Sequence, residues 1–206
     1  MSLPELADLL CTDVEVLKQL WGAEPPTPEG KRRLGGVYLR PHMVCQHARR
    51  LPARRRVIEA DQATWMVQHL NFCPDTWSML FDTCPTCRCM LTWPSAESLN
   101  SCNRCGALLS DRGSKTIPHR DRAALRWVLW LVSEDKEIVA AAISKVPAFF
   151  DIQSATDVYE LTIAFGQAVY AKRYERSQFK GHWTPGHLAA GARMVLEYPR
   201  SIWGLY

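Results

Sequence analysis

The stretch CPTCRCMLTWPSAESLNSCNRCGALL, residues 84–109, contains two Cys-x-x-Cys pairs, Cys84 with Cys87 and Cys102 with Cys105. Zinc takes four tetrahedral ligands, and a Cys-x-x-Cys turn lets two thiolates converge on one ion. Pro85 rigidifies the first pair, and Gly106 suits the positive-φ position that follows such a turn. The tandem pairs therefore predict one structural Zn²⁺ per chain, bound by these four cysteines.

Reduced, unligated thiols or a redox pair are the alternatives to a metal site. A lone Cys-x-x-Cys pair is compatible with either, whereas two tandem pairs favour a metal. A closed shell of four cysteines leaves no position for a substrate water, so the expected role is structural. Cys89 is a possible substitute ligand, but with only one residue between it and Cys87 its ligand geometry is poor, so it is expected to be a bystander.

The composition is that of an ordinary globular protein. The chain has 206 residues, 47% of them hydrophobic and 22% charged, and a chain of this length can bury a core without disulfides. It contains no apolar stretch of about 18 residues and no basic leader followed by an apolar core. We therefore expect neither a membrane helix nor a secretory signal. The expected location is a reducing cytoplasm, where paired cysteines favour metal sites over disulfides.

Basic residues cluster in one segment. No Asp or Glu occurs between residues 30 and 58, and clustered cations attract phosphates or acidic surfaces. This segment is predicted to bind nucleic acid or an acidic protein partner, and a solvated loop that neutralises a neighbouring acidic patch is the alternative. The candidate residues are Lys31, Arg32, Arg33, Arg40, Arg49, Arg50, Arg54, Arg55 and Arg56.

The sequence predicts four segments. Residues 1–23 read as a helical hairpin of helix-turn-helix type, and residues 24–64 as a basic linker segment that is rich in Pro and Gly near its start. Residues 65–112 form the zinc-ribbon module, and residues 113–206 the C-terminal helical domain. The expected fold is mainly α, with a small zinc-ribbon or zinc-knuckle module, an N-terminal helical hairpin and a C-terminal helical bundle.

Capping residues mark the expected C-terminal helices. The chain is expected to be helical from Asp121 onward, and a second helix starts near Ser133. A third is capped between Ser154 and Asp157, and a fourth begins at Thr184 followed by Pro185 at the first helical position. Apolar residues recur at helical spacing in each segment, which predicts one buried face per helix.

The cysteine region resembles the zinc-finger region of TniQ proteins, which select targets for certain DNA transposons and CRISPR-associated transposons. The residues that carry the resemblance are Trp65, the stretch FCPDTWSMLFDTCPTC at residues 72–87 and CNRC at residues 102–105. The C-terminal MVLEYPRSIWGLY resembles the family's recurring W-P-x-x-F helix end, with Tyr198, Pro199 and Ile202 at those positions. The N-terminal LADLLCTDVEVLKQL is similar to the helical start of the domain. On this resemblance the chain is identified as a short or diverged member.

One departure concerns the family's first zinc site. Its Cys-x-x-Cys positions are Val57 and Ala60 here, its histidine position is Thr76, and Cys73 alone remains. The resemblance therefore implies that the first finger is lost and that apolar packing replaces the metal. The alternative is a second site rebuilt from His42, Cys45 and His47 with Cys73.

The resemblance implies an adaptor that links a target-recognition complex, either a CRISPR effector or target DNA, to a AAA+ ATPase transposition regulator. Guide RNA is a further candidate partner, self-association is compatible with such a role, and the protein would join the nucleoid when acting. No P-loop, GxSxG, HExxH or GxGxxG motif occurs, so a non-enzymatic role is expected. His182 and His187 flank a helix start and are expected to be structural. The alternatives are a zinc-ribbon transcription regulator that reads DNA with residues 2–21 and a purely structural subunit.

Overall fold

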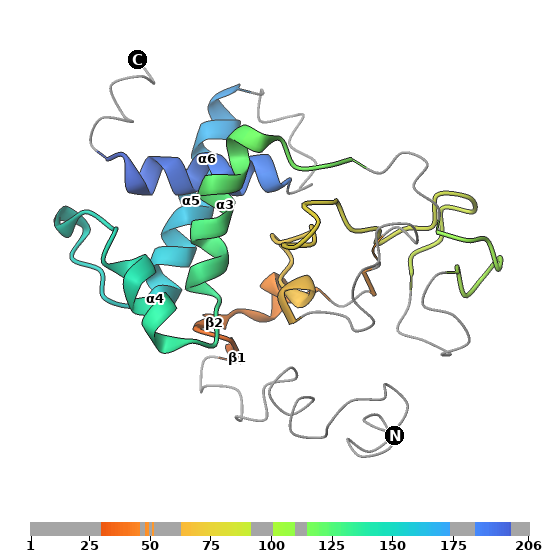
Figure 1. The fold of residues 1–206 in the computed structure, drawn as a ribbon, viewed down its shortest axis with the longest axis horizontal. Coiled ribbons are helices and arrows are strands. Elements are labelled where there is room, and N and C mark those ends of the chain that lie inside the picture. Colours follow the sequence, from red (N-terminus) through yellow and green to blue (C-terminus); the bar gives the residue numbers. More distant parts are fainter. Residues whose placement is uncertain are drawn as a thin grey trace. The chain divides into compact units, whose positions relative to one another are not determined.

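The computed structural model of the chain describes residues 30–45, 48–49, 51, 63–91, 101–109, 115–173 and 184–198 (Figure 1). The chain divides into two compact units, Met1–Leu34 with Leu39–Thr116, and Gly35–Tyr38 with Ile117–Tyr206. The described residues contain four α-helices, one small antiparallel hairpin and short 3₁₀ turns. The fold of this part is therefore mixed rather than mainly α, and the predicted N-terminal hairpin at residues 1–23 lies outside the described residues.

A β-hairpin stands within the segment that the sequence predicts to be a linker. Strands β1 (Arg32–Leu34) and β2 (Val37–Leu39) pair across the Gly35–Gly36 turn. Val37 and Leu39 are fully buried while Tyr38 between them is exposed, which is the alternation expected of a half-buried strand. The 3₁₀ turns η1 (Pro41–Met43) and η3 (Ala63–Met66) follow.

The four helices belong to the second unit, which we call the helical unit. They are α3 (His119–Leu131), α4 (Lys136–Ile143), α5 (Ala155–Arg173) and α6 (Pro185–Leu196), with the 3₁₀ turn η4 (Ala148–Phe150) between α4 and α5. Among the described helices, none combines the length and apolarity needed to cross a bilayer.

Local capping explains where three of these helices begin. The Asp135 side chain accepts hydrogen bonds from the amides of Glu137 and Ile138, so α4 starts slightly later than Ser133 predicts. The Ser154 hydroxyl accepts from the amides of two following residues, at 3.2 and 3.5 Å, which confirms the predicted cap of α5. Thr184 precedes Pro185 at the start of α6, also as predicted.

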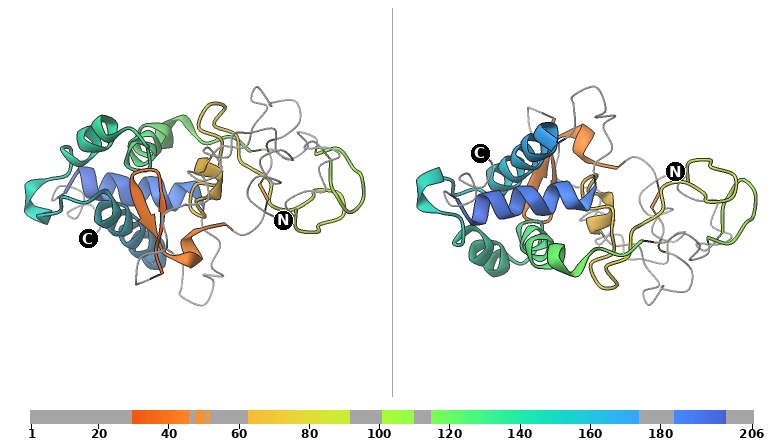
Figure 2. Two further views of the ribbon diagram at one scale, coloured as in Figure 1. Left: turned by 90° about the horizontal axis from the view of Figure 1, so that it is seen from below. Right: turned by 90° about the horizontal axis from the view of Figure 1, so that it is seen from above.

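Helix α6 packs across α5 and α3 (Figures 1 and 2). The crossing with α5 is close because Gly191 carries no side chain: a Cβ there would lie 1.9 Å from the backbone oxygen of Thr162. Around this crossing the apolar faces of the helices meet in a dry core. Its fully buried members include Leu125, Val128, Tyr159, Leu188 and Val195.

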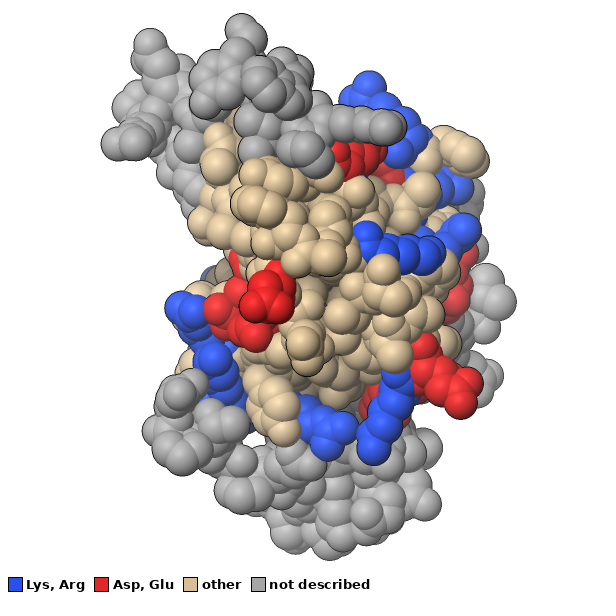
Figure 3. Space-filling model, turned by 90° about the vertical axis from the view of Figure 1, so that its left-hand side faces the viewer, with Lys and Arg blue, Asp and Glu red and all other residues tan. Residues whose placement is uncertain are grey.

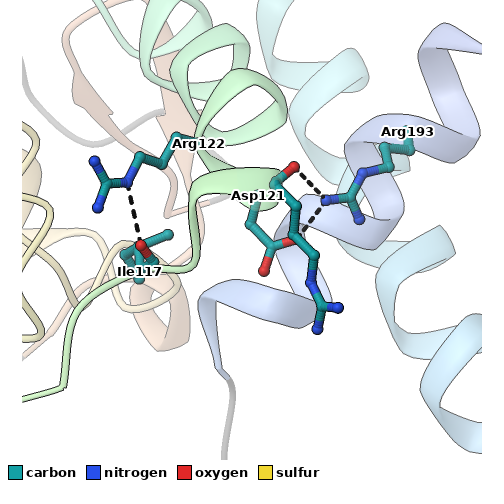
Figure 4. A network of polar contacts seen from close by, with 5 residues as sticks. Ile117, Asp121, Arg122 and Arg193 are labelled. Carbon is teal, nitrogen blue, oxygen red and sulfur yellow. Dashed lines mark hydrogen bonds and ion pairs between the residues drawn. The ribbon is translucent and has the colours of Figure 1, made fainter.

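A polar network joins the start of α3 to α6 (Figure 4). The guanidinium of Arg193 donates to the backbone oxygen of Arg120 at 3.0 Å and to the carboxylate of Asp121. Arg122 donates to the backbone oxygen of Ile117 at 3.1 Å. The first turn of α3 is thus held by charged side chains as well as by apolar packing. A second link ties α3 to α4, where the buried Trp127 indole donates to the backbone oxygen of Ala142 at 2.9 Å.

Candidate metal centre

Three turns of one design follow one another in the first unit. They begin at Cys73, Cys84 and Cys102, and we call them the first, second and third knuckle (residues 72–79, 83–90 and 101–108). In each, the cysteine amide donates to the carbonyl five residues later, at 2.8 Å in all three. The amide four residues later donates back to the cysteine carbonyl at 2.8–2.9 Å. That later residue has a positive φ in every knuckle: 55° at Trp77, 57° at Arg88 and 69° at Gly106.

The flanks of the knuckles repeat as well. In each knuckle, the residue just before the leading cysteine forms an antiparallel bridge with the residue six positions after that cysteine. The leading cysteine is buried, with at most 2% of its surface exposed, and a buried leucine stands seven positions beyond it. These leucines are Leu80, Leu91 and Leu109. The backbone thus forms the same turn three times, with and without a second cysteine.

The second and third knuckles bring four sulfurs together. The Sγ atoms of Cys84 and Cys105 are 3.8 Å apart, and those of Cys87 and Cys102 are 3.7 Å apart. All four Sγ atoms lie within 4.8 Å of one another. A tetrahedral ion with metal–sulfur bonds of about 2.3 Å has sulfur–sulfur edges of about 3.8 Å. The four predicted ligands therefore lie close enough to bind one metal ion, and their spacing is compatible with a structural metal.

Backbone N–H groups surround the leading sulfurs. The amides of Thr86 and Cys87 donate to Cys84 Sγ at 3.4 and 3.5 Å, and the amide of Arg104 donates to Cys102 Sγ at 3.4 Å. Burial raises the pKa of Cys102, but the amides of Cys105 and Arg104 oppose it, and the pKa falls to about 6. Since the thiolate is the form that binds metal, these donors favour the metal-binding form of Cys102.

Cys89 contributes a fifth sulfur to this cluster. Its Sγ lies 3.1 Å from that of Cys87 and 3.4 Å from that of Cys102. The sequence marks Cys89 as a possible substitute ligand but favours a bystander, and the two short sulfur separations place it beside the ligands instead. The knuckle turn instead returns the chain to the sulfurs at this position, and the carbonyl of Cys89 accepts the amide of Cys84.

In the first knuckle aromatic packing replaces the second cysteine. Thr76 stands at the second ligand position, and the rings of Phe72 and Trp77 stack at 5.6 Å with 12° between their planes. The equivalent pairs in the other knuckles are Thr83 with Arg88 and Ser101 with Gly106, which cannot stack. Cys73 is fully buried and clusters with three large apolar side chains, Leu51, Trp65 and Leu80.

The residues considered for a second metal site are not assembled into one in the described part of the chain. No further group of three or more potential ligands lies close together there. Cys45 and Cys73 are buried and His42 is exposed, whereas His47 lies outside the described residues. A histidine that the sequence did not single out, His69, is buried nearby. Burial, Arg49 and His42 lower its pKa to about 4.

The predicted basic residues differ in solvent exposure. Arg32, Arg33 and Arg40 are exposed and Lys31 is half-buried, while Arg50 and Arg54 to Arg56 lie outside the described residues. Arg49 does not belong to an exposed basic surface: it is 5% exposed and donates to the carbonyls of Trp65, Val67 and Gln68 at 2.7–3.1 Å. These hydrogen bonds tie Arg49 to the η3 turn and to the two residues that follow it.

Two further cations stand at the knuckle tips, where Arg88 and Arg104 are exposed. On the helical unit, by contrast, the face drawn in Figure 3 carries Lys and Arg interspersed with Asp and Glu around an uncharged area. Positive and negative charges are therefore mixed on that face. Comparisons with protein-family models, with curated proteins and with solved structures found nothing that matches this chain.

Proposed function

We propose that Cys84, Cys87, Cys102 and Cys105 bind one structural Zn²⁺, and that the chain is a non-enzymatic binding protein. The observation that carries this proposal is the pairing of two equivalent knuckles with sulfur separations of 3.7 and 3.8 Å. Zinc binds four thiolates in a tetrahedron and has no redox chemistry. A closed shell of this kind stabilises a fold and leaves no position for a substrate. The role of the ion is to fix the two turns that supply its ligands.

Elemental analysis of the purified full chain tests this proposal. One zinc per chain is expected, together with none in the Cys84→Ser/Cys102→Ser variant. Cys45→Ser/Cys73→Ser is the matched control, because it removes two buried cysteines outside the cluster and should leave the zinc in place. Two zincs per chain would instead mean that a second site exists, and none in folded protein would refute the proposal.

The finer proposal is that this binding protein is a transposition adaptor of the TniQ type, which links a target-recognition complex or target DNA to a AAA+ ATPase. Its support is the sequence resemblance of residues 65–108, together with exposed cations in the first unit. Cations that contact phosphates position a protein on nucleic acid without reading bases. An adaptor should therefore bind DNA weakly, with steep salt dependence and little sequence preference.

Two measurements test the adaptor role. A AAA+ transposition ATPase should co-purify with the full chain, and DNA affinity should fall log-linearly with salt. Replacing Arg32, Arg33 and Arg40 with Gln should lower the salt slope by about 0.9 for each phosphate contact that is lost. Replacing Arg120, Arg126 and Lys136, exposed cations of the helical unit, is the charge-matched control. A preference of several kcal/mol for one DNA site would instead favour the transcription regulator.

A further inference from the structure

The fifth residue after the leading cysteine has the same backbone position in each knuckle. In the second knuckle this position lies beside the sulfur cluster. The residue there is Ser78 in the first knuckle, Cys89 in the second and Ala107 in the third. The carbonyl at this position accepts the amide of the leading cysteine at 2.8 Å in all three knuckles. The backbone of Cys89 is therefore fixed at a place where a side chain reaches the ligands.

The sulfur of Cys89 touches one ligand from each knuckle, at 3.1 Å from Cys87 and 3.4 Å from Cys102. Both distances are shorter than the edge of about 3.8 Å that separates two sulfurs bound to the same zinc ion. Cys89 is half-buried and packs against the apolar cluster that contains Cys84, Leu91 and Cys102. A thiol held this close to the coordination sphere has the chemistry of a ligand.

We propose that Cys89 is a reserve ligand of this metal site, which takes the place of Cys87 on a thiophilic divalent cation. The inference rests on the proposed metal binding and deepens it. In the exchange the metal–sulfur bond of Cys87 breaks and that of Cys89 forms, while the proton of the Cys89 thiol passes to the freed Cys87 thiolate. No oxidation takes place, and rotation of side chains suffices because the knuckle backbone stays in place.

The two knuckles differ in this respect. Cys105 is the counterpart of Cys87 in the third knuckle, and the position that corresponds to Cys89 is Ala107 there, which has no sulfur. The site is therefore asymmetric: loss of Cys87 is compensated, whereas loss of Cys105 is not. The Cys105→Ser variant provides a matched control with the same chemical change in an equivalent turn.

The test is Co²⁺ titration of the full chain and its variants, followed by absorption of the cobalt–thiolate bands and by chelator competition. Cys87→Ser should bind one Co²⁺ with a four-thiolate spectrum and lose at most about tenfold in affinity, whereas Cys105→Ser and Cys87→Ser/Cys89→Ala should each lose about 100-fold or more. Cys89→Ala alone should bind like the parent chain. Amide protection of Cys73, in the first knuckle of the same unit, checks that every variant is folded.

The outcomes separate this inference from the metal site itself. If the parent chain binds no Co²⁺ or Zn²⁺, the proposed function fails. If the parent binds but Cys87→Ser is as weak as Cys105→Ser, or as the double variant, the reserve role is refuted while the metal site stands. If Cys89→Ala alone weakens binding as much as Cys105→Ser, Cys89 is a resident ligand and the reserve role is again refuted.

Discussion

Removing the proposed metal should unfold two of the three knuckles and leave the first one intact. The three turns share the same backbone hydrogen bonds, so each amide in the second and third knuckles has a counterpart in the first. Only the first knuckle carries a stacked aromatic pair. Chelation of the purified chain therefore separates what the metal stabilises from what apolar packing stabilises, within one molecule.

The size of the effect follows from the side chains. A structural zinc ion contributes about 10–16 kcal/mol of folding free energy at neutral pH. Each 1.4 kcal/mol is about a tenfold change in an equilibrium, so loss of even a quarter of this contribution speeds amide exchange about 100-fold. Phe72 and Trp77 in the first knuckle and Leu80 directly after it are at most 9% exposed, and burying each contributes about 1.5–3 kcal/mol without a metal.

Amide hydrogen exchange followed by NMR, before and after chelation, is the measurement. The amides of Cys84 and Cys102 should lose at least about 100-fold in protection, and the equivalent amide of Cys73 should change by less than about threefold. The amide of Trp77 is compared in the same way with those of Arg88 and Gly106. Equal loss at Cys73 and Trp77 would refute the packing explanation, and full protection of Cys84 and Cys102 in the chelated chain would refute the role of the metal.

Three further predictions concern stability. Gly191→Ala places a methyl group 1.9 Å from the Thr162 oxygen and should cost about 1–3 kcal/mol in urea unfolding. Gly186→Ala on the same helix, whose methyl would meet only side-chain hydroxyls, is its control, and equal losses would contradict the close crossing. Asp121→Ala should cost about 1–2 kcal/mol, since its partner Arg193 is partly exposed and screened. A double-mutant cycle with Arg193→Ala should show coupling, and simple additivity would exclude the ion pair as the cause. The pKa of His69 is lowered from 6.5 to about 4, so the unfolded chain binds a proton that the folded chain refuses. Stability should fall between pH 6.5 and pH 4 by about 3 kcal/mol from this residue, and His69→Gln, measured by urea unfolding at several pH values, should remove that part of the slope; an unchanged slope would show that His69 is not responsible.

Short-range signals made much of the helical unit predictable. Ser154 and Thr184 mark the starts of α5 and α6, because a capping hydroxyl acts on amides only a few residues away. The four clustered cysteines were equally readable from their spacing. The three-residue strands β1 and β2 were not predictable, because they are too short to show a period in the sequence.

Arg49 and the first knuckle show what the sequence does not reveal. An arginine in a basic stretch looks like its neighbours, and only the surrounding fold shows that three carbonyls converge on Arg49. The first knuckle has no second cysteine, so its turn is recognisable from backbone hydrogen bonds and the positive φ of Trp77 alone. Both features depend on residues distant in sequence or on main-chain geometry, which composition and spacing do not encode.

The order of the knuckles along the chain has a consequence for synthesis. Cys105 follows Cys84 by 21 residues, and ribosomes add about 5–20 residues per second. The early thiols of the second knuckle therefore wait about one to four seconds before their partners leave the exit tunnel. The stacked rings of the first knuckle are made before Cys84, whereas Lys115, whose carbonyl accepts the amide of Met79, is made after Cys105. The nascent chain thus carries the aromatic pair of the first turn before any ion can close the other two, and that turn gains its last partner only afterwards.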